Sequence, residues 1–310
     1  MPGDDRVKQT CAYLRMLLLR PGEYRSVWER QAAQAEPEEI DYPAVARVLA
    51  KVDSSPSPGE ADNGPDNGRL AETARLALEG SNLTYDTLDS FIEAFSLGPR
   101  HAKRLQDLMR GSEAVRVITD DVRPPTDLYR TGGPSRYETL SLHELHILGP
   151  DGLPAEHQTI QVVRSMVDGL DSLPYRFDTD ELVVEVVRGG RVGDRLYPVS
   201  DTLYAVDILL TDPLPPGGTA LLQYRTTFFY RSPPAPEFRR GVLGSTKDLT
   251  IWVTFHRDRL PRRVWLARWD AVNHAHIVDR EPAELDDELS VHCRFDAVER
   301  AIVGFTWEWD

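Results

Sequence analysis

Apolar residues in the first third of the chain recur at steps of three and four positions, which is the spacing of one face of an α-helix. Pro21-Gly22 and Leu97-Gly98-Pro99 interrupt this pattern and separate successive helices. Thr84 stands where an N-cap is expected, ahead of the apolar position Leu88. The pattern predicts helices over residues 6–19, 24–35, 43–52, 70–78, 84–95 and 100–109.

One segment breaks the helical region. Residues 53–68, which are Asp53 and the run SSPSPGEADNGPDNG after it, are almost all turn-forming or acidic. Such a composition has no apolar face to bury against a neighbouring helix. We therefore predict a flexible loop at residues 53–68.

Beyond about residue 136 the apolar period changes from 3.6 to 2, which is typical of strands with one buried face. The alternation predicts strands at residues 137–148, 159–167, 181–187, 204–210, 222–230, 249–255, 262–270, 289–295 and 301–309. Many short strands with little helix between them favour an antiparallel, immunoglobulin-like β-sandwich. The expected class is therefore α+β and multi-domain, with a helical domain over 1–112, a linker over 113–136 and a β-sandwich over 137–310.

Net charge and cysteine content indicate which partners and which compartment to expect. The formal net charge is −14, and residues 1–112 contribute 14 basic and 18 acidic side chains, or −4, which leaves −10 for the remainder. Neither part has the positive footprint of a protein that binds nucleic acid mainly through phosphate neutralisation. Cys11 and Cys293 lie far apart, so we expect a reducing compartment and no disulfide framework. Without a signal-peptide core or a long apolar run, the expected location is cytoplasmic, with no membrane partner.

Familiar catalytic signatures are missing from the sequence. No Gly-x-Ser-x-Gly occurs, and the segment Leu243-Gly244-Ser245-Thr246-Lys247 lacks the spacing of a phosphate-binding loop. We therefore expect no catalytic residues and no cofactor, and we predict that the protein is not an enzyme.

Two groups of histidines invite comparison with metal sites. His143 and His146 are three apart on a predicted strand, where they would face opposite sides, so we interpret the segment 143–146 as exposed polar residues. The set His274, His276 and Glu281 matches the His-x-His-(x)4-Glu spacing with which cupin barrels hold a metal on one strand. A polar loop between two strands is the competing interpretation of this second set.

The predicted strands contain five of the six tryptophans. In the strand over 262–270 both faces carry apolar residues, which indicates burial on each side. Core packing is one explanation, and an aromatic surface for a partner is the other. The candidates for such an interaction surface are Trp265, Trp269, Trp307 and Trp309.

The segment GSNLTYDTLDSFIEAFSLGPRHAKRLQDLMRG, residues 80–111, resembles the later helices of the repressor-like helix-turn-helix fold. Together with AVARVLA at 44–50, RLAETARLAL at 69–78 and the stretch 149–180, the chain resembles an actinobacterial family of helix-turn-helix regulators with a C-terminal β-sandwich. That resemblance implies DNA binding or a role in transcription. It makes Arg69, Thr73 and Arg75 candidates for base contacts, and Arg100, Lys103 and Arg104 candidates for phosphate contacts.

Three functions follow from these observations. The first is a DNA-binding or transcription-associated regulator whose β-sandwich serves protein interaction or homodimerisation. The second is a protein-interaction module with a degenerate helix-turn-helix, which the negative charge favours. The third is a metal-dependent, cupin-like enzyme that uses His274, His276 and Glu281.

Overall fold

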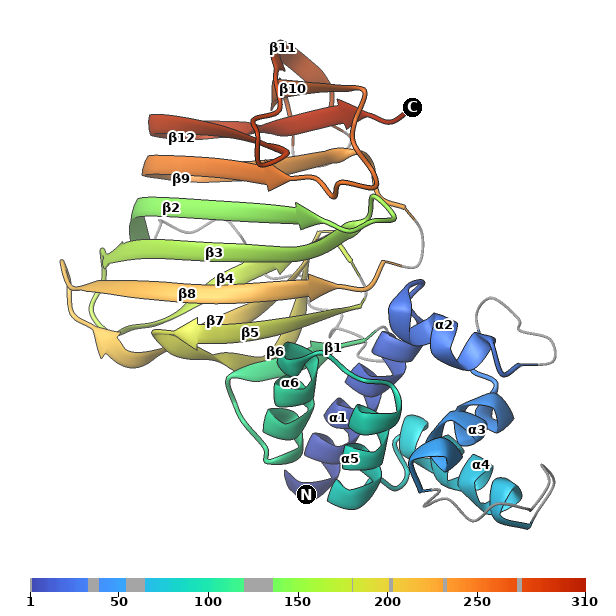
Figure 1. Ribbon diagram of the computed structural model, residues 1–310. Coiled ribbons are helices and arrows are strands. Elements are labelled where there is room, and N and C mark those ends of the chain that lie inside the picture. The colour runs from blue at the N-terminus through green and yellow to red at the C-terminus, as the bar shows by residue number, and fades with distance from the viewer. Residues whose placement is uncertain are drawn as a thin grey trace. The chain divides into compact units, whose positions relative to one another are not determined.

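The structure is a computed structural model that describes residues 2–32, 39–53, 65–119, 136–179, 181–200, 203–230, 233–271 and 275–310. The chain divides into two compact units, Met1–Val117 and Ile118–Asp310. The first unit is mainly helical and the second is built of strands, as the change of apolar period predicts (Figure 1).

The helical unit contains α1 (Pro2–Leu19), α2 (Glu23–Glu29), α3 (Tyr42–Asp53), α4 (Pro65–Leu78), α5 (Tyr85–Ala94) and α6 (Pro99–Met109). Helix α1 packs against α6, and α3 packs against α4 and α5. The short strand β1 (Val115–Ile118) follows and lies within the range 113–136 that the sequence marks as a linker. The loop prediction for 53–68 is wrong at Asp53, which ends α3, and at residues 65–68, which begin α4. Residues 54–64 lie outside the described part.

Local side-chain contacts fix the starts of two helices. Thr84 caps α5, because its hydroxyl accepts a hydrogen bond from the backbone N–H of Thr87. The carboxylate of Asp41 accepts from the Ala44 N–H at 2.9 Å, at the start of α3. In the interior, the buried Trp28 ring donates its N–H to the Leu18 carbonyl at 2.9 Å.

The β-rich unit holds two sheets (Figure 1). In the large sheet the neighbouring strands run in the order β5 (Leu182–Arg188), β8 (Thr219–Phe228), β3 (Pro154–Ser165), β2 (Tyr137–Leu148), β9 (Glu237–Thr254), β12 (Ser290–Glu308), β10 (Arg263–Trp269) and β11 (Ile277–Ala283). The small sheet has the order β4 (Leu170–Phe177), β7 (Leu203–Leu214) and β6 (Gly190–Ser200).

The expectation of a wholly antiparallel sandwich is wrong at one strand pair. Strands β2 and β9 run parallel, with Leu142 beside Leu249. A tight hairpin forces two strands to be antiparallel, but β9 reaches β2 only after six intervening strands. The large sheet is therefore mixed.

Strands β4, β6 and β11 were not expected from the sequence. Every residue of β11 except Ala283 is exposed, so this strand has no apolar alternation and is held by its pairing with β10. Strand β12 is continuous where the pattern predicts two strands. A bulge between Glu299 and Ala301, with Arg300 at a φ of 42°, shifts the alternation in its middle.

Two apolar clusters form the core of the β-rich unit. The first lies between the small sheet and strands β3, β5 and β8 of the large sheet, and includes Leu173, Val184, Ile208 and Leu222. The second joins β2, β9, β10 and β12. The small sheet thus covers only one end of the large one. Among the described residues, no helix combines the length and apolar character needed to cross a membrane.

Candidate functional site

The β2–β3 pair carries three ionisable side chains into the interior of the β-rich unit. Glu144 and His146 are two positions apart on β2 and share one face, whereas His143 projects from the other face. The antiparallel register sets His146 opposite His157 of β3. Glu144, His146 and His157 are only 3%, 4% and 5% exposed. Two adjacent strands therefore bring three titratable groups into one buried space.

Arg240 of β9 supplies the counter-charge for this cluster. Its Nη2 lies 2.7 Å from Oε1 of Glu144, and Nε2 of His157 lies 3.4 Å from the same oxygen. Burial opposes the charged form of Glu144, but the Arg240 charge and the His157 hydrogen bond outweigh it and hold the pKa of Glu144 below its ordinary value. The carboxylate is thus ionised and pairs with one guanidinium.

Several polar atoms of the cluster have no hydrogen-bond partner among the described residues. They are both ring nitrogens of His146, Nδ1 of His157 and Oε2 of Glu144. Burial, with a smaller contribution from His157, lowers the pKa of His146 well below its usual value, so this imidazole is neutral. Its ring stacks on Phe238, with centroids 4.7 Å apart. Buried polar groups are nearly always paired, so this set of atoms requires an explanation.

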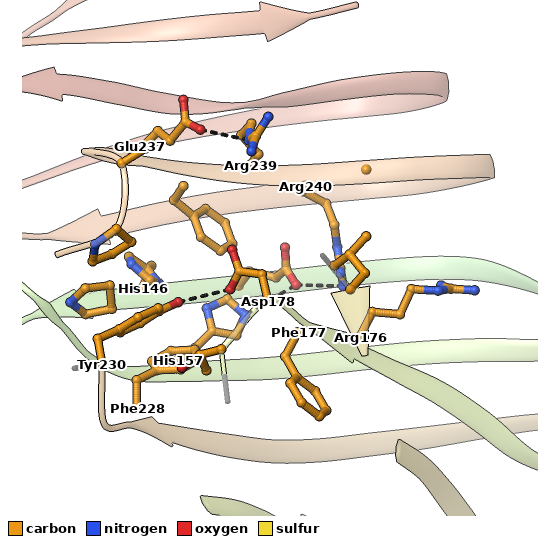
Figure 2. Close-up of a pocket in the computed structure, with 18 of the residues that line it drawn as sticks. His146, His157, Arg176, Phe177, Asp178, Phe228, Tyr230, Glu237, Arg239 and Arg240 are labelled. Atoms are coloured by element: carbon orange, nitrogen blue, oxygen red, sulfur yellow. Dashed lines mark hydrogen bonds and ion pairs between the residues drawn. The ribbon is translucent and has the colours of Figure 1, made fainter. Parts of the chain in front are cut away.

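Glu144, His146 and His157, which carry these unpaired atoms, all line a cavity of about 600 Å³ (Figure 2). The aromatic residues of its lining are Tyr175, Phe177, Phe228, Phe229, Tyr230 and Phe238. The Tyr230 hydroxyl donates to Oδ1 of Asp178 at 3.0 Å. Burial, followed by the neighbouring Asp178 charge, raises the pKa of Tyr230 above its ordinary value, so the phenol is neutral. The cavity thus combines aromatic walls with many charged and polar groups, among them Asp178, Glu181 and Arg176.

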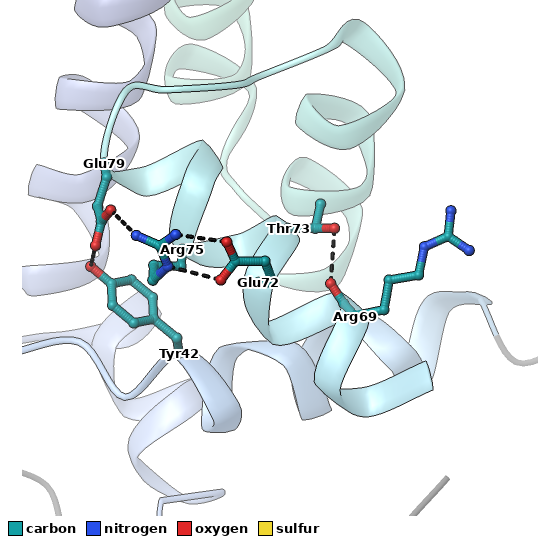
Figure 3. A network of polar contacts seen from close by, with 6 residues as sticks. All are labelled: Tyr42, Arg69, Glu72, Thr73, Arg75 and Glu79. Carbon is teal, nitrogen blue, oxygen red and sulfur yellow. Dashed lines mark hydrogen bonds and ion pairs between the residues drawn. The ribbon is translucent and has the colours of Figure 1, made fainter. Parts of the chain in front are cut away.

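The residues predicted to read DNA bases are largely engaged within α4. Arg75 bonds both carboxylate oxygens of Glu72 and also pairs with Glu79 (Figure 3). The Thr73 hydroxyl donates to the backbone oxygen of Arg69, whose own side chain points away from this network. Of the three, Arg69 presents the most accessible charge.

The residues predicted to contact phosphate differ in their exposure to solvent. Arg100 is exposed, and Lys103 is exposed but forms an ion pair with Asp107. Arg104 is 2% exposed and lies in the helical core, so its assignment as a phosphate contact is wrong. A guanidinium can reach a phosphate only from the surface.

The predicted metal set is described only in part. His274 lies outside the described residues, and the side chain of His276 is 85% exposed beside Asp270. Glu281 is exposed on β11. Within the described ranges, no group of three or more His, Cys, Asp or Glu side chains is arranged to hold a metal ion.

The four tryptophans proposed as an interaction surface separate into two pairs. Trp269 and Trp307 are 5% and 3% exposed, so their assignment to a surface is wrong. Trp265 and Trp309 are partly exposed, and each ring is covered by an arginine, Arg280 and Arg259 respectively. The apolar environment of the core explains the first pair.

The interpretation of residues 143–146 as exposed polar residues is wrong for Glu144 and His146. It holds for His143, whose side chain is 44% exposed. The signal in the sequence is the pair Glu144 and His146 at i and i+2, followed one hairpin later by His157. Arg240 has no such signal, because its place beside Glu144 depends on the parallel β2–β9 pairing.

No family model matches this sequence, and no curated protein matches it either. Among solved structures, a candidate protease from Parabacteroides distasonis is 12% identical with a TM-score of 0.36, and the alignment covers 56% of this chain and 41% of that one. An M1 zinc metallopeptidase from Deinococcus radiodurans is 15% identical with a TM-score of 0.31, over 57% of this chain and 44% of that one. This chain thus spans less than half of either protein, and so loose a likeness identifies neither its fold nor its activity.

Proposed function

We propose that the β-rich unit is a binding module for a small organic molecule that enters the cavity beside His146. The observation that carries this proposal is the state of His146, whose two ring nitrogens are unpaired although the residue is only 4% exposed. An unpaired buried polar group costs on the order of 1–3 kcal/mol. A ligand that pairs with these nitrogens would recover that cost on binding.

The surroundings of His146 support the same proposal. The cavity of about 600 Å³ lies within the size range of small-molecule sites. Glu144 and His157, which carry the other unpaired atoms, line it together with His146. The segment 233–235 also lines the cavity, and Pro233 and Ala235 are exposed, so this side adjoins solvent.

The experiment is thermal denaturation of the full-length protein in the presence of the low-molecular-weight fraction of an extract from its host. A ligand that binds only the folded protein raises the Tm. We expect a rise for the wild type and for His143→Phe, which changes the exposed face of the same strand, but not for His146→Phe. If no fraction raises the Tm, or if both variants lose the rise equally, the proposed function is wrong.

For the helical unit we propose DNA or transcription-partner binding, which rests on the sequence resemblance and on the exposed side chains of Arg69, Arg100 and Lys103. The helix-turn-helix fold of this unit and the immunoglobulin-like fold of the β-rich unit are likewise proposals. Its test is binding of the full-length protein to sheared host DNA at low and at physiological salt. Charge reversal at these three positions should abolish binding. Absence of binding even at low salt would make a protein the partner to seek.

A further inference from the structure

We infer that the ligand of the cavity is an uncharged, planar molecule whose edge carries a hydrogen-bond donor beside an acceptor, as in primary carboxamides and nitrogen heterocycles. This inference rests on the proposed function and specifies the chemistry of its ligand. Charge balance, hydrogen-bonding capacity and the shape of the aromatic walls support it separately.

The charges next to His146 are paired, although Asp178 and Glu181 line the same cavity. The Glu144 carboxylate pairs with Arg240 at 2.7 Å, and Arg239 pairs with Glu237 at 3.0 Å. The Arg176 guanidinium points away from the two histidine rings (Figure 2). An anion placed beside His146 would be desolvated without a counter-charge of its own, which is costly. A cation would have to compete with the Tyr230 hydroxyl for the Asp178 carboxylate. The balance therefore favours a neutral ligand.

The unpaired atoms require both a donor and an acceptor from the ligand. Oε2 of the ionised Glu144 can only accept, whereas neutral His146 offers one N–H donor and one acceptor nitrogen. A carboxylate ligand only accepts and an ammonium or amidinium ligand only donates, so each leaves part of this set unpaired. A carboxamide edge, with its N–H beside its C=O, satisfies both kinds of atom.

The aromatic walls favour a flat ligand. Phe238 lies against both imidazoles, with ring centroids 4.7 Å from His146 and 5.0 Å from His157. Phe228 lies 5.6 Å from Tyr230 and 6.2 Å from His146, measured between centroids. Stacked or edge-on contacts with such rings are available to a planar molecule and not to a compact aliphatic one.

Three probes of nearly identical shape separate these possibilities. Benzamide is neutral and carries a donor and an acceptor, benzoate is an anion that only accepts, and benzamidinium is a cation that only donates. Saturation-transfer NMR titrations with the full-length protein would give the three affinities. We expect benzamide to bind most tightly, with each ion at least about tenfold weaker, because each ion leaves a buried group unpaired.

Two substitutions and one control test the site itself. His146→Phe keeps a stacked ring but removes both nitrogens, so it should abolish the preference for benzamide, while His143→Phe on the opposite face should leave it unchanged. Glu144→Gln leaves Arg240 without its carboxylate and should reverse the order, so that benzoate binds more tightly than benzamide. If Glu144→Gln does not fold, the comparison of His146→Phe with His143→Phe still tests whether the preference for benzamide depends on His146.

The possible outcomes separate this inference from the proposed function. Tighter binding of either ion by the wild type, or equal binding of all three probes, overturns the neutral-ligand class and leaves the cavity as a binding site. If no probe binds but a host fraction raises the Tm of the wild type and not of His146→Phe, the neutral-ligand class is likewise overturned and the cavity remains a binding site. If no probe binds and no fraction acts, only water pairs the buried atoms, and both proposals fail.

Discussion

His146 and His157 lie directly opposite each other on β2 and β3, with ring centroids 5.8 Å apart, and neither is more than 5% exposed. Two charged imidazoles at this separation in a buried space would repel each other. Their partners differ, because Nε2 of His157 faces Glu144 whereas both nitrogens of His146 are unpaired. The hairpin therefore holds one histidine that pairs with Glu144 and one whose ring nitrogens have no partner among the described residues.

His146→Phe should stabilise the ligand-free protein by about 1–2 kcal/mol, because it removes two buried polar atoms that have no partner. The adjacent cavity has room for the larger ring. Tryptophan fluorescence during urea unfolding would measure this, since five of the six tryptophans belong to the β-rich unit. His143→Phe is the matched control and should change the free energy of unfolding little. A loss of stability in His146→Phe would mean that ordered water already pairs the ring nitrogens.

Arg240→Met should lower the free energy of unfolding by about 3 kcal/mol, because it leaves the buried Glu144 carboxylate without its counter-charge. Arg239→Met is the control on the neighbouring residue. Its ion pair with Glu237 is half-buried, so we expect a loss below about 1 kcal/mol. The second change Glu144→Gln should restore much of the loss in the Arg240→Met background. If the two arginine variants are equally stable, the Glu144–Arg240 pair does not stabilise the fold.

The helices could be predicted from the sequence because their signals are local. Apolar spacing, Pro99 and the Thr84 cap act within one or two turns, and the structure begins and ends α5 and α6 within one residue of the expected positions. The burial of Arg104 could not be predicted in this way. Arg104 lies on α6 among exposed basic residues, and its burial depends on how other helices, such as α1 and α5, pack against α6.

The candidate site was missed because its parts come from different strands. Glu144 and His146 alternate with His143 and Leu145, and a polar residue at a strand position is more often exposed than buried. Their burial depends on which face the other strands cover. The position of Arg240 depends further on a parallel pairing between strands that are far apart in the sequence. Such pairings have no local signal.

Thr84→Ala should destabilise the helical unit by about 1 kcal/mol, because the Thr84 hydroxyl accepts the Thr87 N–H at 3.2 Å and caps α5. Thr84→Ser retains the oxygen and should lose only a small part of this energy. Circular dichroism during thermal unfolding, which reports mainly on helices, would measure both variants. Equal losses for alanine and serine would show that the methyl group, and not the cap, is responsible.

His101 should make the helical unit sensitive to mild acid. Burial, followed by the charges of Arg104 and Arg100, lowers its pKa to about 4 from 6.5, and its Nδ1 lies 2.6 Å from the Tyr13 hydroxyl. Between these two values the unfolded chain binds a proton that the folded one does not. Stability is therefore complete above about pH 6.5 and falls by up to about 3 kcal/mol as the pH approaches 4. His101→Gln should flatten this part of the helical unfolding profile measured by circular dichroism. The exposed-site control His143→Gln should not, and an unchanged slope in His101→Gln would assign the acid sensitivity to other groups.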